Sequence, residues 1–374
     1  MKRFLSLIIV FVIIFAVVCC TCFSGNAAKD EISAKAFVLY CADNSEVLFS
    51  KNLNTPMPMA STTKIMTSLI ALEYAQIEDK EVEFTEEMAA EGSSMYLKSG
   101  DVVKLSDLAA GMMTVSGNDA ANAVAYSLSG SVEDFALLMN KRAKELSMKN
   151  TNFTNPSGLP DDNHYSTVYD MALLMTAAME NENFASLTQK KSVKVDFVNP
   201  QGHSVTYTNH NRLLSMYEYC TGGKTGYTKE AGRCLVTSAQ KDGLRLVAVT
   251  FDAPNDWQDH IAVYNSGFDD YAAVLADDIT SYSIDVMGAE KDSVTVVLDE
   301  ETKCVVDASL KDKVRVQVYL PPFVYAPISK GDVLGKVVLT LEGKVLKESA
   351  IVSREDVQCE KVTAFRKLRH RLMR

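Results

Sequence analysis

The pattern of apolar and polar residues changes twice along the chain. An uncharged apolar stretch runs from Phe4 to Phe23, helical and strand patterns mix from Ala36 to about Tyr271, and short β-type runs follow after Asp277. Strands at both ends of the middle region, with helices between them, favour an α+β domain whose N- and C-terminal strands share one antiparallel sheet. The last region is typical of a small all-β domain.

The periodicity of the middle region predicts individual elements. Alternating or β-branched runs predict strands at Ala36–Cys41, Glu46–Ser50, Arg233–Gln240 and Leu244–Phe251. Helical spacing predicts a helix that begins close to Ser61, others at Leu105–Met113, Asp119–Ser127, Val132–Leu146 and Thr167–Met179, and a last one that ends at Asp270. We expect these elements to form one domain over residues 28–275, followed by the all-β domain over residues 276–355.

The first residues have the pattern of a secretory signal peptide. Lys2 and Arg3 precede the apolar stretch, and the small residues Gly25 and Ala27 stand where a signal peptidase cleaves. This predicts a signal peptide over residues 1–27. An uncleaved anchor is the alternative, because about 20 apolar residues can span a bilayer. Lipidation of a cysteine in this segment is less favoured, since no Gly or Ala precedes one. Each alternative predicts export.

The net charge of the chain and its distribution limit which molecules the protein is expected to bind. The chain has a formal net charge of −10, so it is expected to repel nucleic acid. A basic tail is predicted over residues 356–374, and within it residues 361–374 carry six lysines and arginines and no acidic residue. Val362, Phe365, Leu368 and Leu372 fall on one face of a helix there. Such a segment can bind an anionic membrane surface, which predicts a place on the outer face of the cytoplasmic membrane. A solvated tail is the alternative.

The first candidate for chemistry is an S-x-x-K motif at Ser61 and Lys64. Residues i and i+3 of a helix share a face, so the lysine amine can approach the serine hydroxyl. A hydroxyl becomes a good nucleophile only beside a base, and an amine acts as a base only when it is uncharged. Ser238 and Lys241 have the same spacing but lie at a strand end, where they point to opposite faces.

Two further motifs follow in order. Ser116 and Asn118 form S-x-N at a helix start, where a plain helix cap is the alternative reading. Lys224, Thr225 and Gly226 form K-T-G just before a predicted strand. On an edge strand a cation and a hydroxyl can hold a carboxylate, and the glycine leaves the backbone accessible. A glycine-rich hairpin with a surface lysine is the alternative there.

The ordered set of three motifs resembles the penicillin-recognising serine enzymes, and within them the serine-type D-alanyl-D-alanine carboxypeptidases, or low-molecular-weight penicillin-binding proteins. Four longer segments support the resemblance: Met59–Thr67, Ser116–Ala121, Asn155–Leu159 and Asn211–Leu214. The resemblance implies a β-lactamase/transpeptidase-like domain, with an antiparallel sheet, flanking helices and a helical subdomain, before the all-β domain.

The resemblance also implies roles for the motif residues. Ser61 would attack the carbonyl between the last two D-alanines of a peptidoglycan stem peptide, with Lys64 as the base. Ser116 would pass a proton to the departing amine, and Asn118 would position Lys64 and the substrate. Penicillin and other β-lactams would be covalent inhibitors that acylate the same serine.

The remaining implied residues bind the substrate. Lys224 would supply a positive field at the terminal carboxylate and keep the catalytic lysine neutral, Thr225 would bind that carboxylate, and Arg212 would lie near it. The backbone N–H groups of Tyr227 and of the nucleophile would form the oxyanion hole, beside Gly226. Relatives often carry histidine where Tyr227 stands, so deacylation or substrate choice is expected to differ.

No metal is expected, because the chain contains no H-E-x-x-H motif, and a Ser-His-Asp hydrolase is not indicated, because G-x-S-x-G is missing from the sequence. No cofactor is implied. A serine β-lactamase is the nearest alternative function. Such enzymes need a second base for deacylation, and residues 155–163 offer Asp161 and Asp162 but no Glu-x-x-Leu-Asn pattern. A non-catalytic binder of muropeptides or β-lactams is the alternative from another class of protein.

Overall fold

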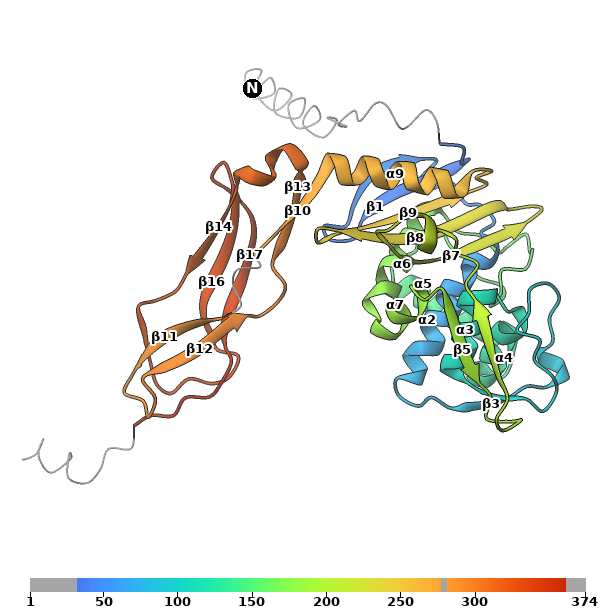
Figure 1. Cartoon of the computed structure of the whole chain (residues 1–374), viewed down its shortest axis with the longest axis horizontal. Helices are drawn as coiled ribbons and strands as arrows, with labels where there is room; N and C mark the ends of the chain where they lie inside the picture. Colours follow the sequence, from blue (N-terminus) through green and yellow to red (C-terminus); the bar gives the residue numbers. More distant parts are fainter. Residues whose placement is uncertain (1–31, 277–280, 361–374) are drawn as a thin grey trace, which may run out of the picture. The chain divides into compact units, whose positions relative to one another are not determined.

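The computed structural model describes residues 32–276 and 281–360 (Figure 1). The predicted signal peptide and the basic residues 361–374 therefore lie outside the described residues. In the part that is described, no helix has the length and apolar character needed to cross a bilayer. The α+β region and the following all-β region are described separately below.

Within residues 32–276, a five-stranded antiparallel sheet of order β2-β1-β9-β8-β7 forms the framework. Its strands are β1 (Ala36–Cys41), β2 (Glu46–Lys51), β7 (Cys220–Thr228), β8 (Gly232–Lys241) and β9 (Leu244–Phe251). The first strand pairs with the last, with Ala36 opposite Phe251. This confirms the predicted α+β fold with N- and C-terminal strands in one sheet. The strand β7, which carries the K-T-G motif, lies at an edge.

Helices cover this sheet and form a helical subdomain beside it (Figure 1). They are α2 (Lys64–Ala75), α3 (Leu105–Val115), α4 (Asn118–Ser129), α5 (Val132–Glu145), α6 (Val168–Glu180), α7 (Glu182–Thr188), α8 (Leu213–Met216) and α9 (Asp256–Asp270), with 3-10 turns η1 (Ala60–Thr63) and η2 (Glu86–Met88). The predicted helices are all present, with ends that differ by a few residues. The short α7 and α8 were not predicted.

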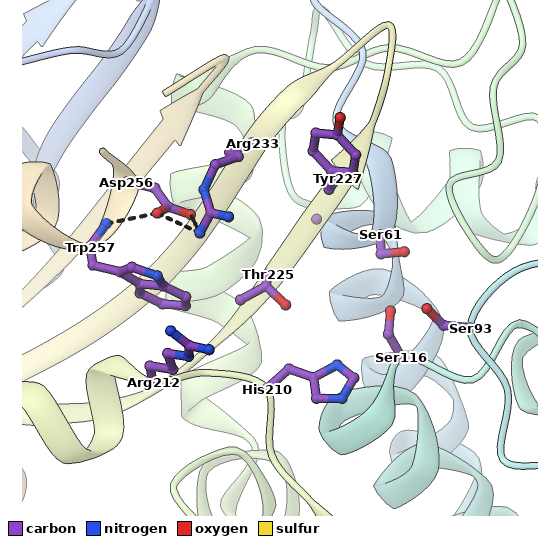
Figure 2. Close-up of a pocket in the computed structure, with 11 residues that line it drawn as sticks. Ser61, Ser93, Ser116, His210, Arg212, Thr225, Tyr227, Arg233, Asp256 and Trp257 are labelled. Atoms are coloured by element: carbon purple, nitrogen blue, oxygen red, sulfur yellow. Dashed lines mark hydrogen bonds and ion pairs between the residues drawn. The ribbon is translucent and has the colours of Figure 1, made fainter. Parts of the chain in front are cut away.

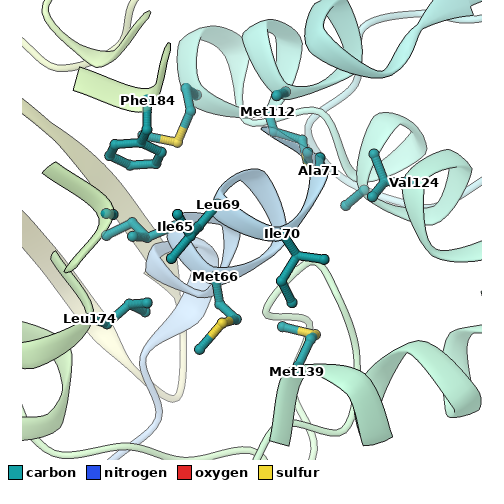
Figure 3. Packing of buried hydrophobic residues seen from close by; sticks show 14 of the residues in the cluster. Ile65, Met66, Leu69, Ile70, Ala71, Met112, Val124, Met139, Leu174 and Phe184 are labelled. Atoms are coloured by element: carbon teal, nitrogen blue, oxygen red, sulfur yellow. The ribbon is translucent and has the colours of Figure 1, made fainter. Parts of the chain in front are cut away.

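The helix α2 lies at the centre of the hydrophobic core (Figure 3). Its residues from Lys64 to Leu72 are all buried, and side chains from α3 to α7 surround it, including Met112, Leu174 and Phe184. A helix buried on every side has few ways to move, because protein interiors are close-packed. The turn that precedes α2, which carries Ser61, is therefore rigidly placed.

Two small hairpins were not predicted. The strands β3 (Glu81–Glu83) and β4 (Val102–Lys104) pair with each other, as do β5 (Ser192–Asp196) and β6 (Ser204–Thr208). Each strand fully buries one residue, and the strands are only 3 residues long in the first hairpin and 5 in the second, so each gives a short sequence signal. Such short strands depend on the contacts that the rest of the fold supplies.

The all-β prediction is confirmed for the C-terminal region. Within residues 281–360, a six-stranded sheet has the order β14-β16-β17-β12-β11-β15. Its strands are β11 (Tyr282–Met287), β12 (Ser293–Leu298), β14 (Val314–Tyr319), β15 (Phe323–Tyr325), β16 (Val333–Leu341) and β17 (Lys344–Ser353), while β10 (Tyr271–Leu275) pairs with β13 (Lys303–Asp307) before the turn η3 (Ala308–Lys313). One set of alternate residues, including Val294, Leu339 and Ile351, is fully buried in a core of its own.

Candidate active site

The side chain of Lys64 joins the first two motifs. Its Nζ atom lies 3.1 Å from Ser61 Oγ and donates hydrogen bonds to Asn118 Oδ1 at 2.6 Å and to the backbone carbonyl of Ser157 at 2.6 Å. All three acceptors are uncharged groups, and the lysine side chain is fully buried. No carboxylate accepts a hydrogen bond from this amine, and its burial favours the neutral base.

The nucleophile candidate sits in a tight turn rather than in regular α-helix. Ser61 lies in η1, and residues i and i+3 eclipse one another in a 3-10 turn, which places its hydroxyl over Lys64. Ala60 enters the turn in the left-handed region at φ 47°. The carbonyl of Ala60 is approached closely by Gly158, where an added Cβ would lie 1.9 Å from that oxygen. Only glycine fits there.

The second motif forms the junction of two helices. Ser116 ends α3 in the left-handed conformation, with φ 63° and ψ 33°, and Asn118 is the first residue of α4. The cap position of α4 is Gly117, and no side chain caps this helix. The alternative reading of the motif as a plain helix cap is therefore wrong. Ser116 lines the cavity, while the Asn118 amide donates through Nδ2 to the carbonyl of Glu91 at 2.5 Å.

Asp119 organises the loop beside this junction, and the sequence analysis missed it. Its carboxylate accepts hydrogen bonds from the backbone N–H groups of Met95 at 2.9 Å and Leu97 at 3.1 Å, and from Ser94 Oγ at 2.6 Å. The preceding residue of this loop, Ser93, lines the cavity. An acidic residue in the first turn of a helix is common, so the sequence alone does not indicate this role for Asp119.

The third motif brings a second buried lysine to the site. Lys224 on β7 is 1% exposed, and burial lowers its pKa to about 7. Burial lowers the pKa of Lys64 well below its ordinary value, and the charge of Lys224 lowers that pKa further, against a smaller opposite effect of Asp119. The reading of K-T-G as a hairpin with a surface lysine is therefore wrong. Two amines in one dry site cannot both hold a proton easily, and Lys64 is the one left neutral.

Gly226 allows the edge strand to approach the nucleophile. A Cβ at this position would lie 3.0 Å from the backbone nitrogen of Ser61 and 3.1 Å from the carbonyl of Met59. The backbone N–H of Ser61 thus lies against the edge strand at the residue that precedes Tyr227. Two backbone donors at such a place can hold a developing oxyanion.

These residues surround a cavity of about 410 Å³ (Figure 2). Its wall consists of Ser61, Ser93, Ser116, His210, Arg212, Thr225, Gly226, Tyr227, Arg233, Asp256 and Trp257. Every predicted site residue lies either in this wall or, like Lys64, Asn118 and Lys224, in the buried layer next to it. Ser238, the serine of the second S-x-x-K sequence, does not line this cavity. Its hydroxyl forms a hydrogen bond with the hydroxyl of Thr221 at 2.7 Å.

Comparison with known proteins identifies the family. A family model described as D-alanyl-D-alanine carboxypeptidase matches residues 24–255, and a model of the C-terminal domain of penicillin-binding protein 5 matches residues 268–359. The chain belongs to the D-alanyl-D-alanine carboxypeptidase family. This confirms the resemblance that the three motifs indicated.

Relatives of this carboxypeptidase cover most of its length. The D-alanyl-D-alanine carboxypeptidase DacF of Bacillus subtilis is 34% identical over 337 residues, which is 87% of this chain and 86% of DacF. DacC of Escherichia coli is 31% identical over 348 residues, covering 88% of this chain and 85% of DacC. The crystal structure of penicillin-binding protein 5 from Haemophilus influenzae superposes with a TM-score of 0.64 at 28% identity, covering 88% of this chain and 98% of that one.

The predicted activity is confirmed at the level of the family. The protein is a serine-type D,D-carboxypeptidase, a hydrolase of the cell wall that removes the terminal D-alanine of peptidoglycan peptides through an acyl-enzyme, which penicillin also forms. The two alternatives, a serine β-lactamase and a non-catalytic binder, are not favoured by these matches. In the described residues, no group of three or more His, Cys, Asp and Glu side chains is placed to hold a metal ion.

Several residues of the carboxypeptidase cavity escaped the sequence analysis. They are Ser93, His210, Arg233, Asp256 and Trp257 in the wall, and the Ser157 carbonyl that binds the buried lysine. A backbone carbonyl has no side-chain signature, although the segment Asn155–Leu159 was noticed as part of the resemblance. The pairing of Arg233 with Asp256 joins β8 to the start of α9, so only the fold reveals it.

Proposed function

We propose that Ser61 is the nucleophile of this carboxypeptidase and that Lys64 is its base. The observation that carries the proposal is the set of hydrogen bonds made by the Lys64 amine, which reaches Ser61 Oγ and otherwise only neutral acceptors. The hydroxyl oxygen attacks the carbonyl carbon of the penultimate D-alanine while its proton passes to Lys64 Nζ. The N–H groups of Ser61 and Tyr227 stabilise the resulting oxyanion.

Collapse of this tetrahedral species breaks the C–N bond and leaves an ester on Ser61. The departing nitrogen takes a proton from the hydroxyl of Ser116, which Lys64 restores in turn. D-Alanine leaves with that proton, and water then attacks the ester and regenerates the free hydroxyl. The support for Ser116 is its place in the cavity wall, opposite the edge strand (Figure 2). Asn118 keeps the amine of Lys64 aligned for both transfers.

The terminal carboxylate is bound on the other side of the scissile bond. Lys224 supplies positive charge, the hydroxyl of Thr225 donates a hydrogen bond, and the guanidinium of Arg212 faces the same cavity. A bound carboxylate raises the pKa of Lys224, because an opposite charge stabilises the ammonium form. Substrate binding therefore fixes the charge of Lys224 and, through repulsion between the two amines, the neutrality of Lys64.

Tyr227 is proposed to act through its backbone rather than its ring. Its side chain is 66% exposed and lies at the rim of the cavity. The histidine that relatives often carry at this position supplies the same backbone N–H group. The proposed oxyanion role therefore does not depend on the tyrosine ring. The ring is expected to influence which acyl group enters and how readily water reaches the ester.

The proposal is tested by locating the penicillin adduct by mass spectrometry of the digested protein. We expect the added mass on the peptide that contains Ser61 and its complete loss in Ser61→Ala. Ser238→Ala is the matched control, because Ser238 stands in the second S-x-x-K sequence and does not line the cavity. A variant Ser61→Ala that still carries the adduct, or a Ser238→Ala that lacks it, would overturn the assignment.

We further propose that the protein is exported by a signal peptide over residues 1–27. The exported chain consists of a catalytic domain over 28–275, a β-domain over 276–355 and a tail over 356–374 that holds it at the outer face of the cytoplasmic membrane. The charge pattern of that tail supports the membrane contact. Deletion of residues 361–374 is expected to move the mature protein from the membrane to the soluble fraction. An unchanged distribution, once removal of the signal peptide is verified, would contradict the anchor.

A further inference from the structure

The cavity extends well beyond the reacting groups. Figure 2 shows Arg212, Arg233 and Trp257 on the far side of Thr225, away from Ser61. A departing D-alanine has six non-hydrogen atoms, which fill only part of a space of about 410 Å³. The part of the cavity bordered by Arg212, Arg233 and Trp257 is called the distal pocket below.

The distal pocket has a rigid wall. Asp256 is 2% exposed and accepts two hydrogen bonds from Arg233 Nη2, at 2.8 and 2.9 Å. The same carboxylate accepts a hydrogen bond from the backbone N–H of Trp257 at 2.9 Å. The guanidinium carbon of Arg233 then lies 5.8 Å from the centre of the indole ring. One buried carboxylate thus fixes both a cation and an aromatic face, as a preformed binding site requires.

The charge of the distal pocket is positive. Asp256 neutralises Arg233 in part, but Arg212 has no ion pair with any residue that the structure describes, and the Nζ atom of Lys224 donates to the backbone carbonyl of Thr225 at 2.7 Å. His210, which lies between Thr225 and Ser116 in Figure 2, adds little charge because burial and Lys224 lower its pKa. Cations therefore outnumber the carboxylate that faces them, and an anionic group is favoured over a cationic one.

We propose that the distal pocket is a subsite for the side chain of the departing residue, and that it accepts a D-residue with an acidic side chain. The inference rests on the proposed function, since Thr225 must hold the terminal carboxylate. The terminal carboxylate lies at Thr225 and the scissile nitrogen lies beside Ser61. The side chain of the departing residue then extends past Thr225 toward Trp257. Its methylene groups pack on the indole, and its carboxylate meets the two guanidinium groups.

The test compares peptides that share one acyl part and end in D-Ala followed by D-Ala, D-Glu, D-Gln or D-Lys. Release of the last residue gives kcat/KM for each peptide. We expect the D-Glu peptide to be cleaved about tenfold better than the D-Lys peptide, with D-Gln between them. Equal kcat/KM values for D-Glu and D-Lys would overturn the proposal. Cleavage of the D-Ala peptide alone would also overturn it, while leaving the proposed function intact; cleavage of none would contradict the proposed function itself.

Trp257→Ala provides the second arm, because the clamp by Asp256 uses the backbone of Trp257 and is retained. We expect kcat/KM for the D-Glu peptide to fall about tenfold and that for the D-Ala peptide to change less than about twofold. Trp257→Phe should restore most of the loss. Tyr74→Ala, which removes a partly exposed aromatic ring from α2, is the control and should change neither value. An equal loss for both peptides in Trp257→Ala would show a merely structural role.

Discussion

Lys64 and Asn118 are joined by a hydrogen bond of 2.6 Å from Nζ to Oδ1, although 54 residues separate them in the chain. The bond links the buried core helix α2 to the first turn of α4, and it orients an amine that has no carboxylate partner among its hydrogen-bond acceptors. A neutral acceptor positions the amine without stabilising its protonated form. The chemistry of the site depends on this distinction.

Asn118→Asp tests that distinction. The new carboxylate would lie at the Lys64 amine, raise its pKa and keep it protonated. We expect the rate of acylation by penicillin at neutral pH to fall by about 100-fold or more, since general-base catalysis contributes about that factor. Asn122→Asp, on the same helix but not among the hydrogen-bond partners of Lys64, is the charge-matched control and should acylate normally. Normal acylation of Asn118→Asp would show that a neutral acceptor is not needed.

Gly226→Ala tests the approach of the edge strand to the nucleophile. Its methyl group would lie 3.0 Å from the nitrogen of Ser61 and displace β7 from the oxyanion position. Losing one oxyanion donor costs about 3–4 kcal/mol, so we expect kcat to fall by about 100-fold or more with a smaller change in thermal midpoint. Steady-state kinetics and thermal unfolding measure the two effects. Wild-type kcat in this variant would place the oxyanion elsewhere.

The pH dependence of the reaction follows from Lys224. Its pKa of about 7 means that it is charged below that pH and neutral above it. Binding of the terminal carboxylate needs the charged form, so kcat/KM should fall as pH rises through about 7. In the substrate complex the carboxylate raises this pKa, so kcat should fall only at higher pH. Lys224→Arg stays charged throughout and should remove the alkaline fall in kcat/KM. A wild-type kcat/KM that stays level well above neutrality would contradict this account.

His164 makes the fold sensitive to acid. Its Nδ1 accepts from the backbone N–H of Thr154 at 3.0 Å and its Nε2 lies 2.8 Å from Thr63 Oγ1, so the ring is held neutral. Burial lowers its pKa to about 4, against an ordinary value of 6.5. Between these values the unfolded chain binds more protons, so the free energy of unfolding falls as pH drops from 6.5 to 4, by up to about 1.4 kcal/mol per pH unit from this residue.

Denaturant unfolding at several pH values measures this slope. His164→Asn should make the acid loss less steep, and the residual slope should reflect His260, whose pKa burial lowers to about 3. His203→Asn, at an exposed site, should leave the slope unchanged. An identical slope in wild type and His164→Asn would show that His164 does not contribute.

Much of the catalytic layer could be predicted because it depends on side chains at short, regular spacings. Ser61 and Lys64 share one turn, and Thr225 and Gly226 share one edge strand. The second S-x-x-K sequence, at Ser238 and Lys241, could be set aside because it lies on a strand, where residues i and i+3 point to opposite faces. The strands that carry alternating or β-branched residues, such as Leu244–Phe251, were predicted to within a residue or two for the same reason.

The remaining parts depend on contacts that only the fold creates. The carbonyl of Ser157 binds Lys64 through backbone atoms, and Asp119 serves a loop that precedes it by more than twenty residues. The clamp of Arg233, Asp256 and Trp257 joins a strand to the start of the last helix. None of these leaves a periodic or motif-like trace in the sequence, because the partners are set by packing rather than by spacing.

The central claim is that Lys64 is uncharged in the resting enzyme, and an NMR titration of lysine side chains labelled with nitrogen-15 tests it most directly. The Lys64 resonance is assigned by its absence in Lys64→Arg, and the same spectra recorded on Lys224→Arg show how the two amines influence each other. We predict a neutral Nζ at physiological pH, with a midpoint far below the ordinary value of 10.5. A resonance that remains protonated until about pH 10, as for an exposed lysine, would contradict the account.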